Sequence, residues 1–154
     1  FLTGPAALGR GRGDVLSPLR SALRARVLLV WPNISLPTRE VYEKLNSQLT
    51  PHPYDISILL QALQAQELAD IGKLLHNDLE TVSIAQHPVI GSIKDMLRSL
   101  GAEGALMSGS GPTVFGLFRN GEAARRARVA LNRTTWQVIE TETVTDLAVL
   151  GLDR

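Results

Sequence analysis

The residues of this sequence best suited to chemistry lie in one short segment, Met107-Ser-Gly-Ser-Gly-Pro-Thr113. Two glycines alternate with two serines, and apolar segments flank them on both sides. Glycine lets the backbone adopt positive φ and lets a bulky anion approach the amides closely. Successive amides in such a turn can form a concave nest for a phosphate, to which Ser108, Ser110 and Thr113 would add hydroxyl groups. The pattern therefore indicates a phosphate-binding loop.

The same segment is also typical of a tight connection between two strands that binds nothing, because Gly and Ser are common turn formers. The spacing alone leaves both interpretations open. The segment is not a Walker-type loop, since the lysine and the following helix are missing. Ser108 and Ser110 also have no neighbouring base in the sequence that would indicate a nucleophile.

The remaining polar residues give little sign of a second site. The three histidines, His52, His76 and His87, are far apart and form no His-x-x-x-His pair, so we expect no metal site. The chain has no cysteine, which excludes disulfides and thiolate ligands.

Composition narrows the class of protein. The chain has 154 residues, a net charge of +1 and 44% hydrophobic residues. The length and the hydrophobic fraction are enough for one compact domain. The net charge is too small to favour binding to nucleic acid or to a membrane surface. No apolar run approaches the roughly 20 residues of a membrane helix, and no secretory signal is visible. We expect a cytoplasmic protein. Because the sequence does not start with methionine, we expect Phe1 to be the start of a fragment or of a processed chain.

Helical and strand patterns alternate around the loop. Thr38 is expected to be the N-cap of a helix. The expected strands are 26–31, 104–107, 113–118 and 136–140, and the expected helices are 39–49, 56–81, 86–100 and 121–131. This order predicts an α+β protein, specifically a ferredoxin-like two-layer sandwich with helices on one face of a mostly antiparallel sheet.

Several segments resemble one known family. Residues 101–118, Gly-Ala-Glu-Gly-Ala-Leu-Met-Ser-Gly-Ser-Gly-Pro-Thr-Val-Phe-Gly-Leu-Phe, resemble the third signature of the GHMP kinases, in a form similar to the diphosphocytidyl-methylerythritol kinases of non-mevalonate isoprenoid synthesis. Residues 1–19 resemble the segment that joins the two domains of these enzymes. Residues 27–42 resemble their strand, loop and helix at the cytidine end of the site. The tetrapeptide Asn77-Asp-Leu-Glu80 also falls where this family carries one.

The resemblance implies that ATP phosphorylates the 2-hydroxyl of a cytidine-diphosphate-linked sugar alcohol. In the family, the catalytic carboxylate, the assisting lysine and the main glycine-rich loop belong to the N-terminal domain, which would hold most of ATP and Mg²⁺. We therefore expect no catalytic residue in this chain, and we expect the chain alone to be inactive.

The resemblance also implies roles for particular residues. Thr38, Arg39 and Tyr42 match positions at the cytidine end, although Arg39 departs from family members with an apolar residue or proline there. Tyr42 could stack on a pyrimidine, or it could pack in the core with its hydroxyl at the surface. The residues expected to support the phosphates are Ser108, Gly109, Ser110, Gly111 and Thr113.

The expected organisation has two parts. Residues 1–19 are a hairpin or linker left from the missing N-terminal domain, and residues 20–154 are the C-terminal domain. Without its partner domain, the segment 1–19 would be an unpaired edge, so self-association through it is expected. Two alternatives remain open: a ferredoxin-like ligand-binding or interaction module without catalysis, and the C-terminal domain of another GHMP kinase, such as a homoserine or mevalonate-type kinase.

Overall fold

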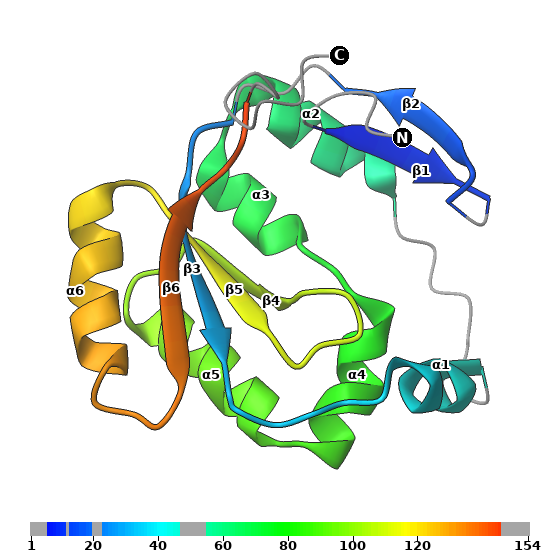
Figure 1. The fold of residues 1–154 in the computed structure, drawn as a ribbon. Helices are drawn as coiled ribbons and strands as arrows, with labels where there is room; N and C mark the ends of the chain where they lie inside the picture. Colours follow the sequence, from blue (N-terminus) through cyan, green and yellow to red (C-terminus); the bar gives the residue numbers. More distant parts are fainter. Residues whose placement is uncertain (1–5, 12, 20–22, 47–54, 146–154) are drawn as a thin grey trace, which may run out of the picture.

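The computed structural model describes residues 6–11, 13–19, 23–46 and 55–145. Within these ranges the main sheet has four strands, and a separate two-stranded hairpin lies apart from it (Figure 1). The hairpin consists of β1 (Ala7–Arg10) and β2 (Val15–Pro18). The main sheet consists of β3 (Arg26–Trp31), β4 (Gly104–Met107), β5 (Val114–Phe118) and β6 (Gln137–Glu142).

The strand order of the main sheet is β4-β5-β3-β6, and all its pairs are antiparallel. β3 is central: Val30 pairs with Val114 of β5 and with Val138 of β6. A helical crossover joins β3 to β4, β5 follows β4 directly, and α6 (Gly121–Leu131) joins β5 to β6. This βαββαβ order is that of the ferredoxin-like fold, which confirms the predicted fold class.

In its described residues, the first crossover contains five helices: α1 (Thr38–Asn46), α2 (Ile56–Ala65), α3 (Leu68–Leu74), α4 (Asp78–Gln86) and α5 (Val89–Ser99). The prediction of one continuous helical stretch over 56–81 was wrong, because the structure has separate helices there. Gln66, with φ of 58°, ends α2, and the extended backbone at Leu75 and Asn77 separates α3 from α4. No helix in the described ranges is long and apolar enough to cross a membrane.

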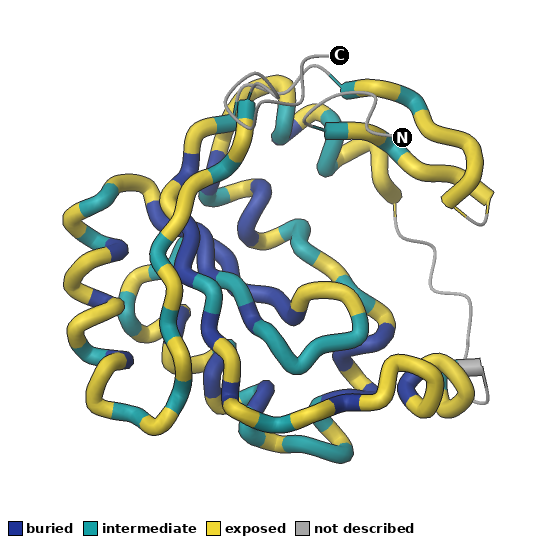
Figure 2. Tube along the Cα trace, in the orientation of Figure 1, coloured by how far each residue is buried: buried dark blue, intermediate teal, exposed yellow. Residues whose placement is uncertain are grey.

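Helices cover both faces of the main sheet. On one face, Leu28 and Val30 pack against α5 and α6 in the larger of two cores. On the other face, Val27 and Leu117 pack against Ala62 of α2 and its neighbours in α3. Figure 2 shows the buried segments of the strands between these two groups of helices. The two-layer sandwich therefore carries a partial third layer, formed by α2 and α3, and the expectation of helices on one face alone was wrong.

Two glycines bring α3 directly onto β4. A Cβ atom added to Gly72 would overlap the carbonyl oxygen of Glu103, and one added to Gly104 would overlap the backbone of Gly72. Only glycine therefore allows this approach of helix backbone to strand backbone. The contact fixes the position of α3, and α4 follows it along the chain.

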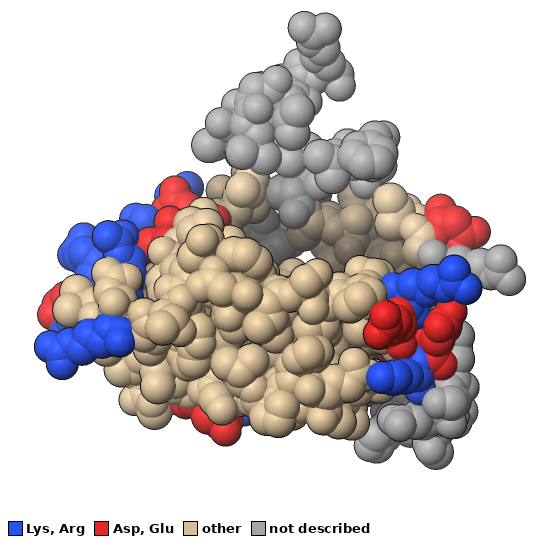
Figure 3. All heavy atoms as spheres, turned by 60° about the horizontal axis from the view of Figure 1, so that its bottom comes forward, with Lys and Arg blue, Asp and Glu red and all other residues tan. Residues whose placement is uncertain are grey.

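Charged side chains of both signs lie together on the molecular surface. Figure 3 shows an uncharged central area, with mixed acidic and basic groups over α6 on the left and α1 on the right. Ion pairs account for part of this mixing, such as Glu122 with Arg126 on α6 and Arg39 with Glu43 on α1. This face therefore carries no extended patch of one sign.

Candidate functional site

The glycine- and serine-rich loop connects β4 to β5, as predicted. Two backbone hydrogen bonds close it: Ser108 N–H donates to the Thr113 carbonyl at 2.8 Å, and Gly111 N–H donates to the Ser108 carbonyl at 2.9 Å. Gly109 and Gly111 both have positive φ, at 56° and 84°. A Cβ atom on Gly111 would lie 2.5 Å from Met107 Sδ, so this position accepts only glycine without rearrangement.

In the first half of the loop, the carbonyls are hydrogen-bonded, whereas two of the amides have no acceptor among the described residues. The four successive carbonyls of residues 107–110 all accept hydrogen bonds, one of them within the loop and the other three from α4 and its N-cap. Within the described part of the chain, the N–H groups of Gly109 and Ser110 have no protein acceptor. Two free amides and nearby hydroxyls are the groups that a phosphate oxygen requires.

Three polar side chains, from the N-cap of α4 and from within the helix, hold the loop. Asn77 Nδ2 donates to the carbonyls of Met107 and Gly109 at 2.9 and 2.8 Å, while its Oδ1 caps α4 by accepting from Leu79 N–H. Glu80 Oε1 accepts from the Met107 N–H at 3.0 Å. Ser83 Oγ lies 3.4 Å from the Ser110 carbonyl oxygen, to which it donates. These residues are three apart, so they lie on one face of the helix.

No role was predicted from the sequence for any of these three residues. The resemblance singled out only the segment that begins at Asn77 and ends at Glu80, and Ser83 carried no signal. Their function depends on partners about 30 residues away, which helical periodicity does not reveal. The spacing of three between these polar residues was the one available sign.

The carboxylate of Glu80 is also paired with a largely buried cation. Its Oε2 bonds to Lys94 Nζ of α5, and the side chains of Glu80 and Lys94 are only 11% and 14% exposed. Buried charges in proteins are normally paired, because an isolated charge is costly to remove from water. One carboxylate thus joins α5 to the first residue of the loop segment.

The N-terminus of α1 contacts the loop directly. Thr38 Oγ1 lies 2.9 Å from Ser110 Oγ. The predicted N-cap role of Thr38 was wrong, because Thr38 is the first residue of the helix and its hydroxyl contacts the loop. α1 is held in place by Val41 and Leu45, which pack in the larger core beside Leu79 of α4.

The other two residues expected at the cytidine end lie on the exposed side of α1. Arg39 Nε donates to Glu43 Oε1 at 2.7 Å, within the same helix. Tyr42 is 51% exposed, so the alternative of core packing for its ring was wrong. The structure therefore brings Thr38 to the phosphate loop, and it leaves Arg39 and Tyr42 on the surface of α1, with no hydrogen bond from either to the described loop residues.

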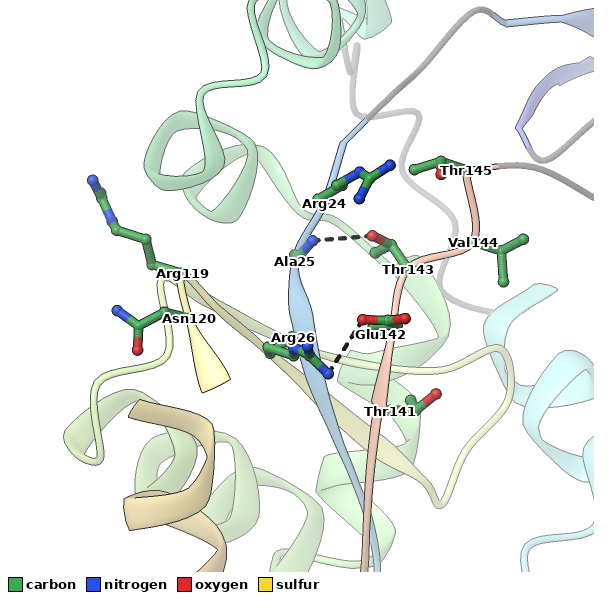
Figure 4. Close-up of a pocket in the computed structure, with 10 residues that line it drawn as sticks. All are labelled: Arg24, Ala25, Arg26, Arg119, Asn120, Thr141, Glu142, Thr143, Val144 and Thr145. Atoms are coloured by element: carbon green, nitrogen blue, oxygen red, sulfur yellow. Dashed lines mark hydrogen bonds and ion pairs between the residues drawn. The ribbon is translucent and has the colours of Figure 1, made fainter. Parts of the chain in front are cut away.

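A pocket of about 480 Å³ lies at the opposite end of the sheet (Figure 4). Arg24, Arg26 and Arg119 line it, and Arg26 forms an ion pair with Glu142 at 3.2 Å. Arg26 pairs with Phe118 of β5, whereas the loop adjoins the other end of that strand. We place the candidate site at the loop, because the convergent polar groups are there.

Displaced pKa values occur away from the loop. Hydrogen bonds from Ser57 lower the pKa of Asp55, and the hydrogen bond and charge of Asp70 raise the pKa of Lys73. His76 Nε2 lies 2.8 Å from Asp78 Oδ1. In the ranges that the structure describes, no three His, Asp or Glu side chains are grouped so that they could hold a metal ion.

Comparison with known proteins agrees with this arrangement. Residues 59–136 match the family described as GHMP kinases C terminal. This match covers half of the chain and includes α4, α5 and the loop, and the chain belongs to the GHMP kinase family. The resemblance seen in the sequence is thereby confirmed.

The similar curated proteins are of one kind. The chain is 39% identical over 142 residues to the 4-diphosphocytidyl-2-C-methyl-D-erythritol kinase of Pelotomaculum thermopropionicum, with 92% of this chain and 50% of that protein covered. It is 48% identical over 122 residues to the kinase of the same name from Lachnoclostridium phytofermentans, covering 79% and 42%. The chain therefore spans about half the length of the curated relatives it matches.

Solved structures share the fold. A crystal structure of 4-(cytidine 5'-diphospho)-2C-methyl-D-erythritol kinase matches with a TM-score of 0.70 at 30% identity, covering 90% of this chain and 50% of that chain. A homoserine kinase from Cytophaga hutchinsonii matches with a TM-score of 0.72 at 17% identity, covering 91% and 48%. The second match shows the fold alone.

Proposed function

We propose that this chain is the C-terminal half of an ATP-dependent kinase that phosphorylates the 2-hydroxyl of 4-diphosphocytidyl-2-C-methyl-D-erythritol, in non-mevalonate isoprenoid precursor synthesis. The observation that carries this proposal is the 39% identity over 92% of the chain to a kinase of that name. The supporting geometry is a loop with free amides at Gly109 and Ser110. We assign residues 1–19 to a hairpin or linker of the N-terminal domain, residues 20–154 to the C-terminal domain, and the enzyme to the cytoplasm.

The described residues fit a phosphate group, and they do not fit a magnesium ion. The amides of Gly109 and Ser110, with the hydroxyls of Ser108, Ser110 and Thr113, would bind phosphate oxygens of ATP. The described residues offer no cluster of carboxylates for a metal, so we assign Mg²⁺ to the N-terminal half. Phosphoryl transfer depends mainly on positioning and charge stabilisation, so a supporting loop matters without a titrating group.

The cytidine end of the substrate would lie over α1. The half-exposed ring of Tyr42 is available to stack on a pyrimidine, and Arg39 is exposed one turn away on the same helix. Thr38 would lie between the two ends of the site, because its hydroxyl already contacts Ser110. No residue of this chain is assigned as catalytic acid or base, and we expect the chain alone to be inactive.

The proposal is tested by measuring ADP release with magnesium-ATP and the cytidylyl substrate. The 154-residue chain is compared with the full-length protein that we propose contains it. We expect turnover only in the full-length protein, with the KM for ATP raised about tenfold or more when Ser108 and Ser110 are both changed to Ala. Thr141→Ala, on the exposed part of β6, is the control and should leave KM unchanged. Turnover of homoserine or mevalonate in place of the cytidylyl substrate would overturn the proposed substrate, and turnover by the chain alone would overturn the assignment of the catalytic residues.

A further inference from the structure

The packing of α4 on α5 does not by itself explain the ion pair between Glu80 and Lys94. Both side chains are nearly buried, and a buried ion pair is often no more stabilising than apolar residues of the same volume. The residues around them, such as Leu79, Val82 and Ile90, already form a continuous apolar core. A role beyond stability is therefore the better explanation for charges at these two positions.

The first part of that role is the position of the backbone. Glu80 Oε1 holds the N–H of Met107, which is the last residue of β4 before the loop. Asn77 holds the carbonyl of the same residue, so the peptide groups on both sides of Met107 are fixed from α4. With the carbonyls of residues 107–110 engaged, the main-chain groups of this half of the loop that have no partner among the described residues are the amides of Gly109 and Ser110. This arrangement makes the loop attractive to an anion.

The second part of the role is charge. A carboxylate beside a phosphate-binding loop would repel the phosphate, and a surrounding of low polarity strengthens that repulsion. Lys94 contacts the second oxygen of the same carboxylate, so the pair has no net charge. A neutral amide acceptor could also hold Met107, but α5 would then present an unpaired ammonium group.

We propose that Glu80 and Lys94 are positioning residues for the nucleotide: Glu80 orients the Met107–Thr113 loop through the Met107 amide, and Lys94 cancels the charge of Glu80 so that the loop can accept a phosphate. This inference rests on the proposed kinase function. It predicts different results for three variants, in which the net charge of the Glu80–Lys94 pair and the acceptor for the Met107 amide are changed separately.

The test uses the full-length protein and measures kcat and KM for both substrates. Lys94→Met leaves the carboxylate uncompensated and should raise the KM for ATP about tenfold or more. The double variant Glu80→Gln/Lys94→Met is neutral and keeps an acceptor for the Met107 amide, so it should restore KM to within about threefold of the original. The double variant Glu80→Leu/Lys94→Met is equally neutral but lacks the acceptor, so its KM for ATP should stay high. In all three, the KM for the cytidylyl substrate should change little.

Equal behaviour of the two double variants would overturn the proposal, because the acceptor would then have no effect. Parallel losses in kcat and in both KM values would also overturn it, since these would reflect a purely structural role.

Amide hydrogen exchange by NMR tests the positioning independently of activity. Exchange at Met107 should be about tenfold faster in Glu80→Leu/Lys94→Met than in Glu80→Gln/Lys94→Met, while Ala105 in the same strand stays unchanged. If the unmodified full-length protein shows no kinase activity, the proposed function fails, and this comparison still decides whether Glu80 holds the loop. Equal exchange at Met107 in the two double variants would show that it does not.

Discussion

Thr38 Oγ1 lies 2.9 Å from Ser110 Oγ, although 72 residues separate the two positions in the chain. Both belong to segments that the sequence assigned to different ends of one substrate-binding site. Their contact joins the start of α1 to the middle of the loop. Because both side chains are exposed enough to meet a ligand, their hydroxyls can exchange this contact for a hydrogen bond to a phosphate.

Replacing Thr38 by Val keeps the shape of the side chain and removes its hydroxyl. We expect the stability to change by less than about 1 kcal/mol, because the lost hydrogen bond is exposed. We expect the KM values for both substrates to rise severalfold. Steady-state kinetics on the full-length protein and urea unfolding measure the two effects. Thr38→Ser should restore KM, and a variant that fails through lost stability alone would contradict a role in binding.

Substitutions at the two loop glycines separate backbone strain from steric overlap. In Gly109→Ala, the alanine must adopt a positive φ, but its Cβ lies in open space. We expect the free energy of unfolding to fall by about 1 kcal/mol. Gly111→Ala has the same requirement and also brings Cβ to 2.5 Å from Met107 Sδ, so it should cost about 2–4 kcal/mol. Urea unfolding of both variants provides the comparison. Equal losses would mean that Met107 moves aside without cost.

The approach of α3 to β4 predicts a large effect for Gly72→Ala. The new Cβ would overlap the backbone oxygen of Glu103, which has no flexible end that could move. We expect a loss of about 3 kcal/mol or more in the free energy of unfolding. Gly91→Ala in α5 is the matched control, because its Cβ would meet Ile84 at an acceptable 3.4 Å. That variant should be neutral or stabilised by up to about 1 kcal/mol through better helix propensity.

The stability contributed by the N-terminus of α2 should fall in acid. Hydrogen bonds from the Ser57 hydroxyl and amide lower the pKa of Asp55, because they favour the ionised carboxylate. A carboxylate with a pKa lower in the folded than in the unfolded chain stabilises the fold above the unfolded value, about 3.9. That contribution is lost as the pH falls through the folded pKa. Asp55→Asn retains an acceptor for the cap and should lose less stability than the original between pH 7 and pH 2.

Urea unfolding at several pH values measures this difference. Asp95→Asn is the control, because it removes an exposed carboxylate of α5 that does not cap a helix. Identical pH profiles for the original protein and Asp55→Asn would contradict the role of the ionised cap.

Self-association through residues 1–19 remains a prediction. Within the described residues, β1 pairs with β2 alone, and Val15 and Leu16 of the hairpin are 55% and 46% exposed. We expect the isolated chain to associate, and we expect Leu16→Lys to weaken that association about tenfold. Sedimentation equilibrium measures it. Val129→Lys on the exposed face of α6 is the control, and a chain that stays monomeric at high concentration would contradict the prediction.

The segments whose patterns are local were predicted well. The bounds of β3 and α6 agree with those predicted from the sequence, since a β-branched and leucine-rich run and an alanine- and arginine-rich segment each carry their own signal. The break of the long helical stretch was missed, because its leucine pattern continues past Gln66.

Contacts between distant segments could not be predicted from periodicity. The loop itself was found from its glycines, but the residues that hold it were not. Glu80 resembles any helical glutamate in the sequence, and only the fold shows that its carboxylate lies between Met107 and Lys94. The same holds for the hydroxyl of Thr38, whose partner is in another part of the chain.

The backbone contact between Gly72 and Gly104 also determines where this domain can bend. With no side chain between them, α3 and β4 have no compressible layer and should move as one rigid piece. Residues 75–77 lie between the end of α3 and the start of α4 and belong to neither helix. Any rocking of α4 relative to this rigid piece would therefore turn the backbone at these three residues, and it would strain the hydrogen bonds that join Asn77 and Glu80 to Met107 of β4.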